Sequence, residues 1–348
     1  MMRSSARLTV ASIALAAALS GVAGLAVSEF AAASSPYEWK LPAGFPKPQV
    51  PPDNPMSQAK VDLGKRLFFD ARLSITGRYA CASCHRPELA FTDGRGRAIG
   101  ATGETLAHHS MSLVNVAYAV SFGWTDAGFD SLESQMRRPL FNRHPVEIGL
   151  SGREATLMRE LTADSVIHAA FVRAFPASAN PVTLRHLIQS IASYERTLLF
   201  ARSAFDRYIF DDDGAALTAS AKRGMALFFG PRLGCAQCHF GVNLAGPAAV
   251  VGKPRPVPLF ADTGTQGRFK VPGLRNVALT SPYMHDGRFA NLEEVVDHYE
   301  HLERDRAPGE TLDPQLRTFR LESDEKHDLI DFLGALSDLQ FAAPAPIQ

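Results

Sequence analysis

The sequence predicts an all-α fold that contains a duplicated unit. Apolar residues recur at helical spacing in several long segments, whereas the alternation typical of strands is sparse. The pattern Gly-x-x-Leu-Phe-Phe, followed by Arg-Leu, occurs in “GKRLFFDARLS” and again in “RGMALFFGPRL”, which indicates an internal repeat. Residues 243–276 are rich in Gly and Pro and are predicted to form a long loop.

The predicted helices follow a proline-rich lead-in, residues 34–55, which is expected to be extended. Apolar residues three or four positions apart give each helix one apolar face. The helical segments are residues 56–69, 132–138, 153–162, 182–199, 219–229, 292–302 and 323–336. In the sixth segment, Asn291 is expected to cap the helix, and Tyr299 lies near the centre of the apolar face. A phenol buried there needs a polar partner.

Residues 1–33 have the order of a secretory signal peptide. Arg3 and Arg7 precede the apolar run “LTVASIALAAALSGVAGLAV”, and the small residues “AAASS” follow it. We expect cleavage near Ala33, a periplasmic location and no membrane contact afterwards; an uncleaved membrane anchor is the alternative. The chain balances 36 Lys and Arg residues against 36 Asp and Glu residues, so no basic excess indicates a nucleic-acid partner.

The four cysteines occur only in two Cys-x-x-Cys-His motifs, “CASCH” and “CAQCH”. This motif is the attachment signature of c-type haem: two thiols bind the haem vinyl groups, and the following His ligates the iron. Two disulfides are the alternative for an exported chain. A zinc site is disfavoured because the motifs stand in opposite halves of the chain. We therefore predict two covalently bound c-type haems, held by Cys81, Cys84 and His85 and by Cys235, Cys238 and His239.

The repeat places one haem motif in each half of the chain. The predicted fold is therefore all-α, with two cytochrome c-like haem domains and long loops. We expect an N-terminal haem domain over residues 34–205 and a C-terminal haem domain over residues 206–348.

Other motifs resemble the bacterial di-haem cytochrome c peroxidase and MauG superfamily. They are “AFTDG”, “SLESQ”, “NRHPVEIG”, “FKVPGLRNVALTSPYMHDG” and “LEEVVDHY”. The lead-in and “MSLVNVAY” are most similar to the MauG-like branch that includes MbnH-type di-haem enzymes. The resemblance covers nearly all of the chain after the signal. It implies that the first domain is the peroxidatic one and that the second haem is six-coordinate.

For the first haem, the resemblance implies that Glu147 is the distal glutamate that moves a proton during peroxide cleavage. Gln135 and Pro139 match distal-pocket positions, and Trp124 matches the Trp between the haems. The alternatives are a surface charge for Glu147, a helix end for Pro139 and a core indole for Trp124. His108 or His109 as a resting-state ligand of the first iron is a further alternative.

For the second haem, the distal ligand is Met in ordinary di-haem peroxidases and Tyr in MauG-type enzymes. The family places it 14 residues after the His of the “YMHDG”-type motif, and that position is Tyr299. The rival ligands in the sequence are His298, Met284, His285 and Met225.

The resemblance also implies a calcium ion between the domains. Thr280 and Pro282 match positions that bind it through backbone carbonyls. His109 stands where the family has an Asn ligand, and Asn115 is the possible substitute, because oxygen suits calcium better than imidazole does. Leu233 also departs from the pattern, since MauG has a second Trp there. That departure argues against the substrate of MauG itself, a methylamine dehydrogenase precursor.

The resemblance therefore implies an exported, MauG-like haem peroxidase-type oxidoreductase. Hydrogen peroxide would form high-valent iron, and long-range electron transfer would then oxidise an aromatic residue, expected to be Trp, of a periplasmic partner. In the MbnH-type case that partner is a copper-binding protein. One alternative is a di-haem cytochrome c peroxidase that detoxifies peroxide with electrons from a small redox protein. The other is a di-haem electron carrier without enzyme activity.

Overall fold

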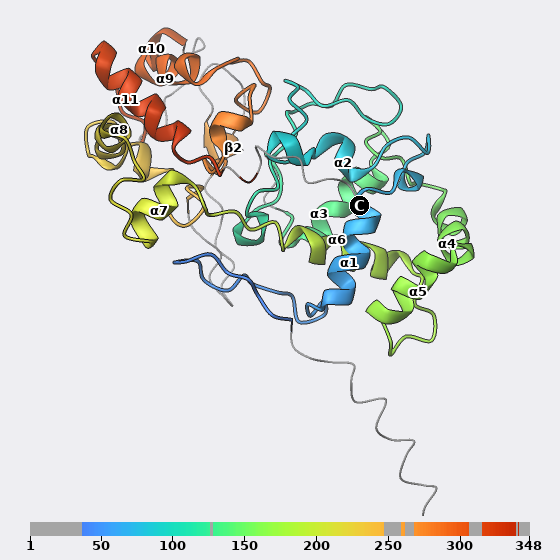
Figure 1. Ribbon diagram of the computed structural model, residues 1–348. Helices are drawn as coiled ribbons and strands as arrows, with labels where there is room; N and C mark the ends of the chain where they lie inside the picture. Colours follow the sequence, from blue (N-terminus) through green and yellow to red (C-terminus); the bar gives the residue numbers. More distant parts are fainter. Residues whose placement is uncertain are drawn as a thin grey trace, which may run out of the picture. The chain divides into compact units, whose positions relative to one another are not determined.

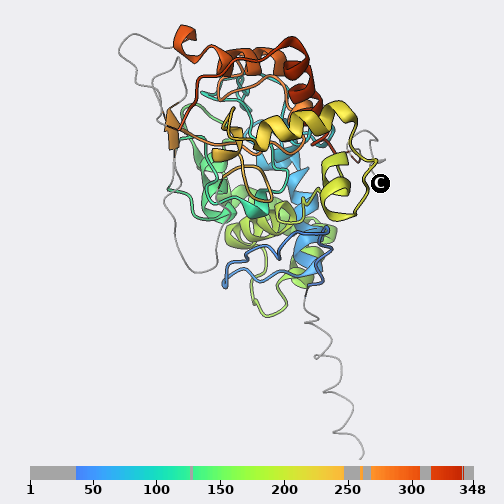
Figure 2. The same cartoon turned by 90° about the vertical axis from the view of Figure 1, so that its left-hand side faces the viewer.

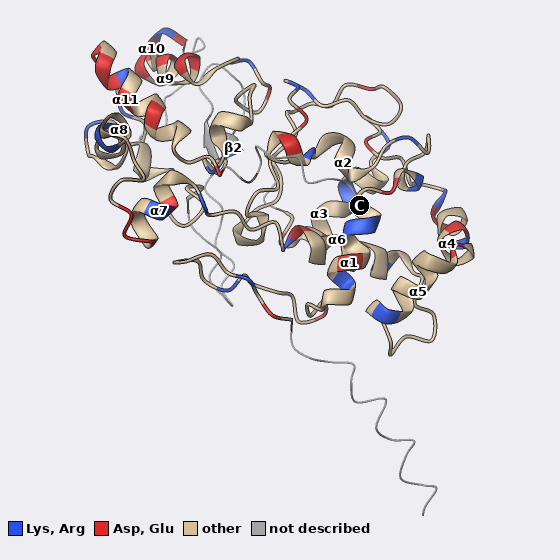
Figure 3. Ribbon diagram, viewed as in Figure 1, with Lys and Arg blue, Asp and Glu red and all other residues tan. Residues whose placement is uncertain are grey.

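The computed structural model describes residues 37–125, 128–246, 259–261, 268–305, 315–338 and 340. These residues are mainly helical, which confirms the all-α prediction (Figure 1). The predicted signal peptide, residues 1–33, lies outside the described residues. Among the described helices, none has the length and apolar character needed to cross a bilayer. Basic and acidic residues both occur on helices of the two halves (Figure 3).

The helices occur where the apolar periodicity predicts them, with four additions, α2, α5, α7 and α10. Those before residue 200 are α1 (Gln58–Phe68), α2 (Cys81–Cys84), α3 (Leu132–Phe141), α4 (Glu154–Ala163), α5 (Ser165–Ala174) and α6 (Leu184–Glu195). The later ones are α7 (Ala204–Phe210), α8 (Ala219–Phe229), α9 (Leu292–Glu300), α10 (Leu302–Asp305) and α11 (Ser323–Gly334). Side-chain caps fix several starts; for example, Asn291 accepts a hydrogen bond from Glu294 N at the start of α9, as predicted.

The internal repeat corresponds to two closely packed helix pairs, α1 with α6 and α8 with α11 (Figures 1 and 2). A glycine lies at each crossing. A Cβ on Gly64 would lie 1.9 Å from Ser190 O, and a Cβ on Gly224 would lie 1.8 Å from Asp328 O. Only glycine permits so close an approach of two helix backbones. The Gly-x-x-Leu-Phe-Phe repeat is therefore a packing motif.

A second pair of equivalent contacts joins a loop to the segment that follows α6 in the first half and α11 in the second half. Asn115 Nδ2 donates to Phe200 O at 2.8 Å, and Asn115 Oδ1 accepts from Phe200 N at 2.7 Å. In the other half, Asn276 Oδ1 accepts from Asp338 N at 2.6 Å. Both asparagines have a left-handed backbone, with φ of 54° and 62°. The duplication therefore extends beyond the helices.

The lead-in contacts both halves through one aromatic residue. The Phe45 ring packs edge-on against Tyr118 at 5.6 Å and against Phe210 of α7 at 6.2 Å. The Arg275 guanidinium lies 4.7 Å from the centre of the same ring. Arg275 also pairs with Asp206 at 2.6 Å, and both side chains are only 3% exposed. Residues from the lead-in, the first half and the second half thus share one cluster.

The prediction that residues 243–276 form a loop is wrong in one part. The strands β1 (Leu259–Ala261) and β2 (Arg268–Lys270) form an antiparallel pair, with Leu259 opposite Lys270. Strands of three residues give too little alternation to be recognised in a Gly- and Pro-rich sequence. Much of the rest of this loop lies outside the described residues.

Candidate di-haem site

The first Cys-x-x-Cys-His motif forms a one-turn helix that ends at its histidine. His85 N bonds to Cys81 O at 2.9 Å, and His85 Nδ1 lies 3.0 Å from Phe91 O. Ala90 and Phe91 have left-handed backbones, which bring that carbonyl back to the imidazole. With Nδ1–H donating to the carbonyl, the tautomer leaves Nε2 as the atom available to an iron.

The second motif repeats this geometry. Residues 235–237 form a 3-10 turn, and His239 Nδ1 lies 3.0 Å from Leu244 O. Gly234, with φ of 75°, supplies the backbone turn before the first cysteine. Burial lowers the pKa of both His85 and His239, which keeps the imidazoles neutral, as iron ligation requires.

The four motif cysteines, all among the described residues, form no disulfide. Burial raises the pKa of Cys84 to about 12 and of Cys235 to about 11, and raises the pKa of Cys81 further. These thiols are therefore neutral, unlike the low-pKa thiolates of redox or catalytic cysteines. Buried thiols beside a neutral imidazole with a fixed tautomer fit haem attachment.

The second motif opens into a cavity of about 240 Å³, here called the second-haem cavity. Cys235, Cys238 and His239 line it, and so does Tyr299 from α9. The other positions of the predicted apolar face also line the cavity: Leu292, Val295 and Val296 in α9, and Leu302 at the start of α10. The structure thus brings the predicted ligand pair His239 and Tyr299 to one cavity, while ligation by Tyr299 stays a prediction.

Three of the four rival ligands also line the second-haem cavity: His298, Met284 and His285. His298 Nδ1 lies 2.8 Å from Asp305 Oδ2, an arrangement that leaves Nε2 available. His285 instead stacks on Phe269 at 3.8 Å, and its backbone carbonyl accepts from His109 N. Met225 is not among the residues that line this cavity; it packs against the hydrophobic core of the second half. His298 is therefore the neighbour to test beside Tyr299.

Trp124 lines the second-haem cavity and also a cavity of about 410 Å³, here called the central cavity. Its Nε1 donates to His109 O at 2.8 Å. The Met111 backbone, two residues on from His109, opposes the lowering of the His85 pKa. Trp124 thus lies beside the second haem motif and is joined through His109 to the segment that contains Met111.

Glu147 lies near the first haem motif. Its charge contributes to the raised pKa of Cys84, which follows mainly from burial of the thiol. Burial raises the pKa of Glu147 itself, and Arg138 opposes this rise. Two backbone bonds hold the segment: Ala101 N donates to Glu147 O at 2.7 Å, and Ile148 N donates to Pro139 O at 2.9 Å. Glu147 is therefore a partly buried acid beside Cys84 rather than a surface charge.

Gln135 and Pro139 lie on α3, one turn apart, and both are partly exposed. Pro139 is inside this helix, which continues to Phe141, so the alternative that it ends the helix is wrong. The Pro139 carbonyl instead holds the Glu147 segment. Leu233 is 3% exposed and packs in the hydrophobic core of the second half.

The predicted calcium ligands are only partly brought together. Thr280, Pro282 and His109 line the central cavity. Asn115 is not among its lining residues, because both ends of its amide are bonded to Phe200. His109 Nδ1 lies 2.6 Å from Arg95 O, which makes this residue a structural link in the first half. His108 packs edge-on against His285 at 5.5 Å, near the second-haem cavity rather than the first motif. Calcium stays a prediction.

Two ionisable residues near these sites were not predicted. Lys270 lines both cavities, donates from Nζ to Ser121 O at 2.8 Å, and has its pKa lowered to about 8 by burial. Glu195, in α6, has its pKa raised to about 8 by burial. Comparison of the two halves, residue by residue, was the sequence signal that could have drawn attention to Glu195.

Known proteins with similar sequences match this arrangement. The profile of the di-haem cytochrome c peroxidase family matches residues 58–214. The methylamine utilization protein MauG of Methylorubrum extorquens is 36% identical over 321 residues, which cover 89% of this chain and 85% of that protein. The chain belongs to the di-haem cytochrome c peroxidase and MauG family.

Other relatives lie on both branches of the family. Cytochrome c551 peroxidase of Pseudomonas aeruginosa is 32% identical over 256 residues, covering 70% of this chain and 72% of that protein. The crystal structure of a MauG-like protein associated with microbial copper homeostasis is 33% identical, with a TM-score of 0.82, and the match covers 88% of this chain and 97% of the other. The chain is thus a haem peroxidase-type oxidoreductase, and its family implies haem cofactors.

Proposed function

We propose that the chain is exported and uses hydrogen peroxide to oxidise an aromatic residue, expected to be Trp, of a partner protein by long-range electron transfer. The observation that carries this proposal is the position of Tyr299, which lines the second-haem cavity together with His239. A phenolate oxygen opposite an imidazole favours oxidised iron, because axial ligands set haem potentials. The similarity to MauG over most of the chain supports the same choice.

We further propose a copper-binding periplasmic protein as the partner. The support is the similarity, at 33% identity, to a MauG-like protein associated with microbial copper homeostasis. The order of the N-terminal residues supports export of the chain to the same compartment.

Each site residue has a role that follows from its surroundings. When bound, the haems supply peroxide chemistry and store the oxidising equivalents. His85 and His239 present Nε2 because a backbone carbonyl holds each Nδ1–H. Glu147 keeps its proton to a higher pH than an ordinary carboxyl, so it can pass a proton between the peroxide oxygens. Trp124 lines both cavities and would carry charge between the two sites.

Spectra of the ferric holoprotein, with and without peroxide, test the ligand assignment. Tyr299→Phe should change the low-spin signal, whereas His298→Gln, one position away on α9, should not. The reverse pattern would assign ligation to His298. An unchanged signal in both variants would exclude both residues and would remove the support that Tyr299 gives to a MauG-type function.

Mass spectrometry of a copper-binding periplasmic partner tests the reaction. Peroxide and the holoprotein together should add oxygen to a Trp of the partner, and Glu147→Gln should slow this by about 10²–10⁴-fold, the usual contribution of a positioned acid–base group. Glu160→Gln, an exposed acid on α4, is the matched control. Partner oxidation at the wild-type rate in Glu147→Gln would exclude the acid–base role.

A second candidate function is detoxification of peroxide with electrons from a small redox protein. The similarity to cytochrome c551 peroxidase supports it, as does Met284, a possible thioether ligand that lines the second-haem cavity. Rapid peroxide turnover with reduced cytochrome c, together with a low-spin signal lost in Met284→Leu, would favour this candidate.

A further inference from the structure

The two halves correspond residue by residue along α6 and α11. Ser190 and Asp328 face the two crossing glycines, and Tyr194 and Phe332 pack edge-on or tilted against the phenylalanine of each repeat at 5.2 Å. Beyond the helices, the carbonyls of Leu198 and Leu336 accept from Asn115 N and Asn276 N, respectively. The same offset in numbering relates Ser190 to Asp328, Tyr194 to Phe332 and Leu198 to Leu336. The same offset makes Glu195 the counterpart of Leu333.

Glu195 and Leu333 occupy equivalent places but differ in chemistry. Leu333 is 8% exposed and lines the second-haem cavity. Glu195 is 7% exposed, and its charge contributes to the raised pKa of the Cys81 thiol in the first haem motif. One haem site therefore contains a buried acid where the other contains a leucine.

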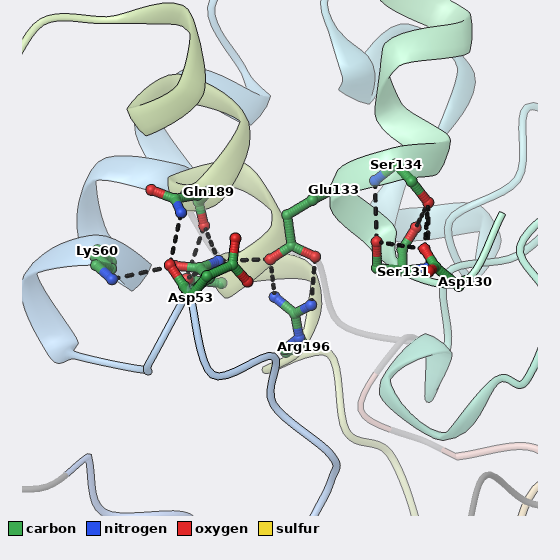
Figure 4. A network of polar contacts seen from close by, with 10 residues as sticks. Asp53, Lys60, Asp130, Ser131, Glu133, Ser134, Gln189 and Arg196 are labelled. Carbon is green, nitrogen blue, oxygen red and sulfur yellow. Dashed lines mark hydrogen bonds and ion pairs between the residues drawn. The ribbon is translucent and has the colours of Figure 1, made fainter. Parts of the chain in front are cut away.

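No cation neutralises Glu195 directly. The neighbouring Arg196 forms a bidentate ion pair with the carboxylate of Glu133, with N–O distances of 2.8 and 2.6 Å (Figure 4). Glu133 also accepts from Asn54 Nδ2 at 2.6 Å. Within the described residues, the Glu195 carboxyl has neither a hydrogen bond nor an ion pair, and burial raises its pKa to about 8. Burial of an acid without a partner costs free energy of folding. Such groups are concentrated at functional sites, which suggests a functional role for Glu195.

We propose that the Glu195 carboxyl, whenever it is ionised, places negative charge near the first haem motif, where the second haem motif has Leu333, and so lowers the reduction potential of the first iron. A nearby anion stabilises iron in its more positive oxidation states, and the low dielectric of the interior strengthens this effect. The inference rests on the two-haem arrangement within the proposed function, but not on the ligand Tyr299 or on any partner. Glu195 acts on the iron through its charge and contacts no substrate.

Redox titration of the holoprotein, with the two haems followed by their separate spectra, tests this inference. The titration is done above pH 8, where the carboxyl is ionised. Glu195→Gln and Glu195→Leu, the latter being the residue of the other half, should both raise the reduction potential of the first haem and leave that of the second unchanged. Glu160→Gln on α4 should change neither.

Two results would overturn the inference. One is an unchanged first-haem potential in Glu195→Gln. The other is an equal shift of both haems, since this would indicate a general structural change. The reciprocal Leu333→Glu should lower the potential of the second haem. Because potentials are measured without peroxide or partner, failure of the proposed oxidation would leave this result interpretable.

Discussion

Replacement of the crossing glycines by alanine should destabilise the fold. A Cβ on Gly224 would lie 1.8 Å from Asp328 O and 2.9 Å from Phe332 Cβ. Reaching ordinary contact at 3.4 Å requires α8 and α11 to separate by about 1.6 Å. Overpacking costs about 1–3 kcal/mol, and contact with rigid backbone places this case at the upper end. The higher helix propensity of alanine offsets this cost by about 1 kcal/mol. We therefore expect a net loss of about 2 kcal/mol.

Denaturant unfolding of the holoprotein measures this loss as a lower midpoint with an unchanged slope. Gly64→Ala should behave in the same way, because its Cβ would meet Ser190 O at 1.9 Å. Gly334→Ala, at the end of α11, is the matched control: no atom lies within 4 Å of its Cβ, and it should stabilise by up to about 1 kcal/mol. The reasoning fails if Gly224→Ala is as stable as the wild type or behaves like this control.

Three other outcomes can be measured by the same unfolding assay. Arg275→Met should cost about 3–5 kcal/mol because it leaves the buried Asp206 carboxylate unpaired, whereas Arg185→Met, from an exposed pair with Asp53, should cost less than about 1 kcal/mol. Asn115→Ala should cost about 2–3 kcal/mol by leaving both polar groups of the Phe200 backbone without their partner, and an unaltered midpoint would exclude that role. Glu195→Gln should make the free energy of unfolding less dependent on pH. In the folded chain Glu195 keeps its proton up to about pH 8, whereas in the unfolded chain it keeps it only up to about pH 4.5. The wild type therefore loses stability as the pH rises between these values, by up to roughly 5 kcal/mol. A Gln variant with the wild-type pH profile would contradict this last assignment.

Local sequence patterns predicted most of the helices because each helix carries its own apolar face. The segment 219–229 coincides with α8, and α9 begins at the predicted Asn291 cap. Four helices were missed, of which α2 and α10 have only four residues each. Only Asp164 separates α5 from α4, and its carboxylate caps α5 through Val166 N and Ile167 N, so the apolar pattern runs on between them. With seven residues, α7 is too short for periodicity to be recognised.

The candidate site was predictable where its chemistry is local and not where it depends on distant contacts. Cys-x-x-Cys-His contains both attachment thiols and the iron ligand in five residues. By contrast, nothing in the sequence shows that both ends of the Asn115 amide bond to the backbone of Phe200. Glu195 was missed because a glutamate on a helix is ordinarily exposed. Only its correspondence with Leu333 in the repeated half reveals a buried position.

The position of Phe45 has a consequence for the order in which the protein matures. This residue lies in the proline-rich lead-in, yet its neighbours Phe210 and Arg275 come much later in the chain. Because a chain is synthesised from its N-terminus, the Phe45 ring lacks these two contacts until most of the polypeptide has been made. Helices α1 to α6 can form before that point, but the lead-in can take its final place only after most of the second half has been made. A residue near the start of the fold is thus among the last to reach its final contacts.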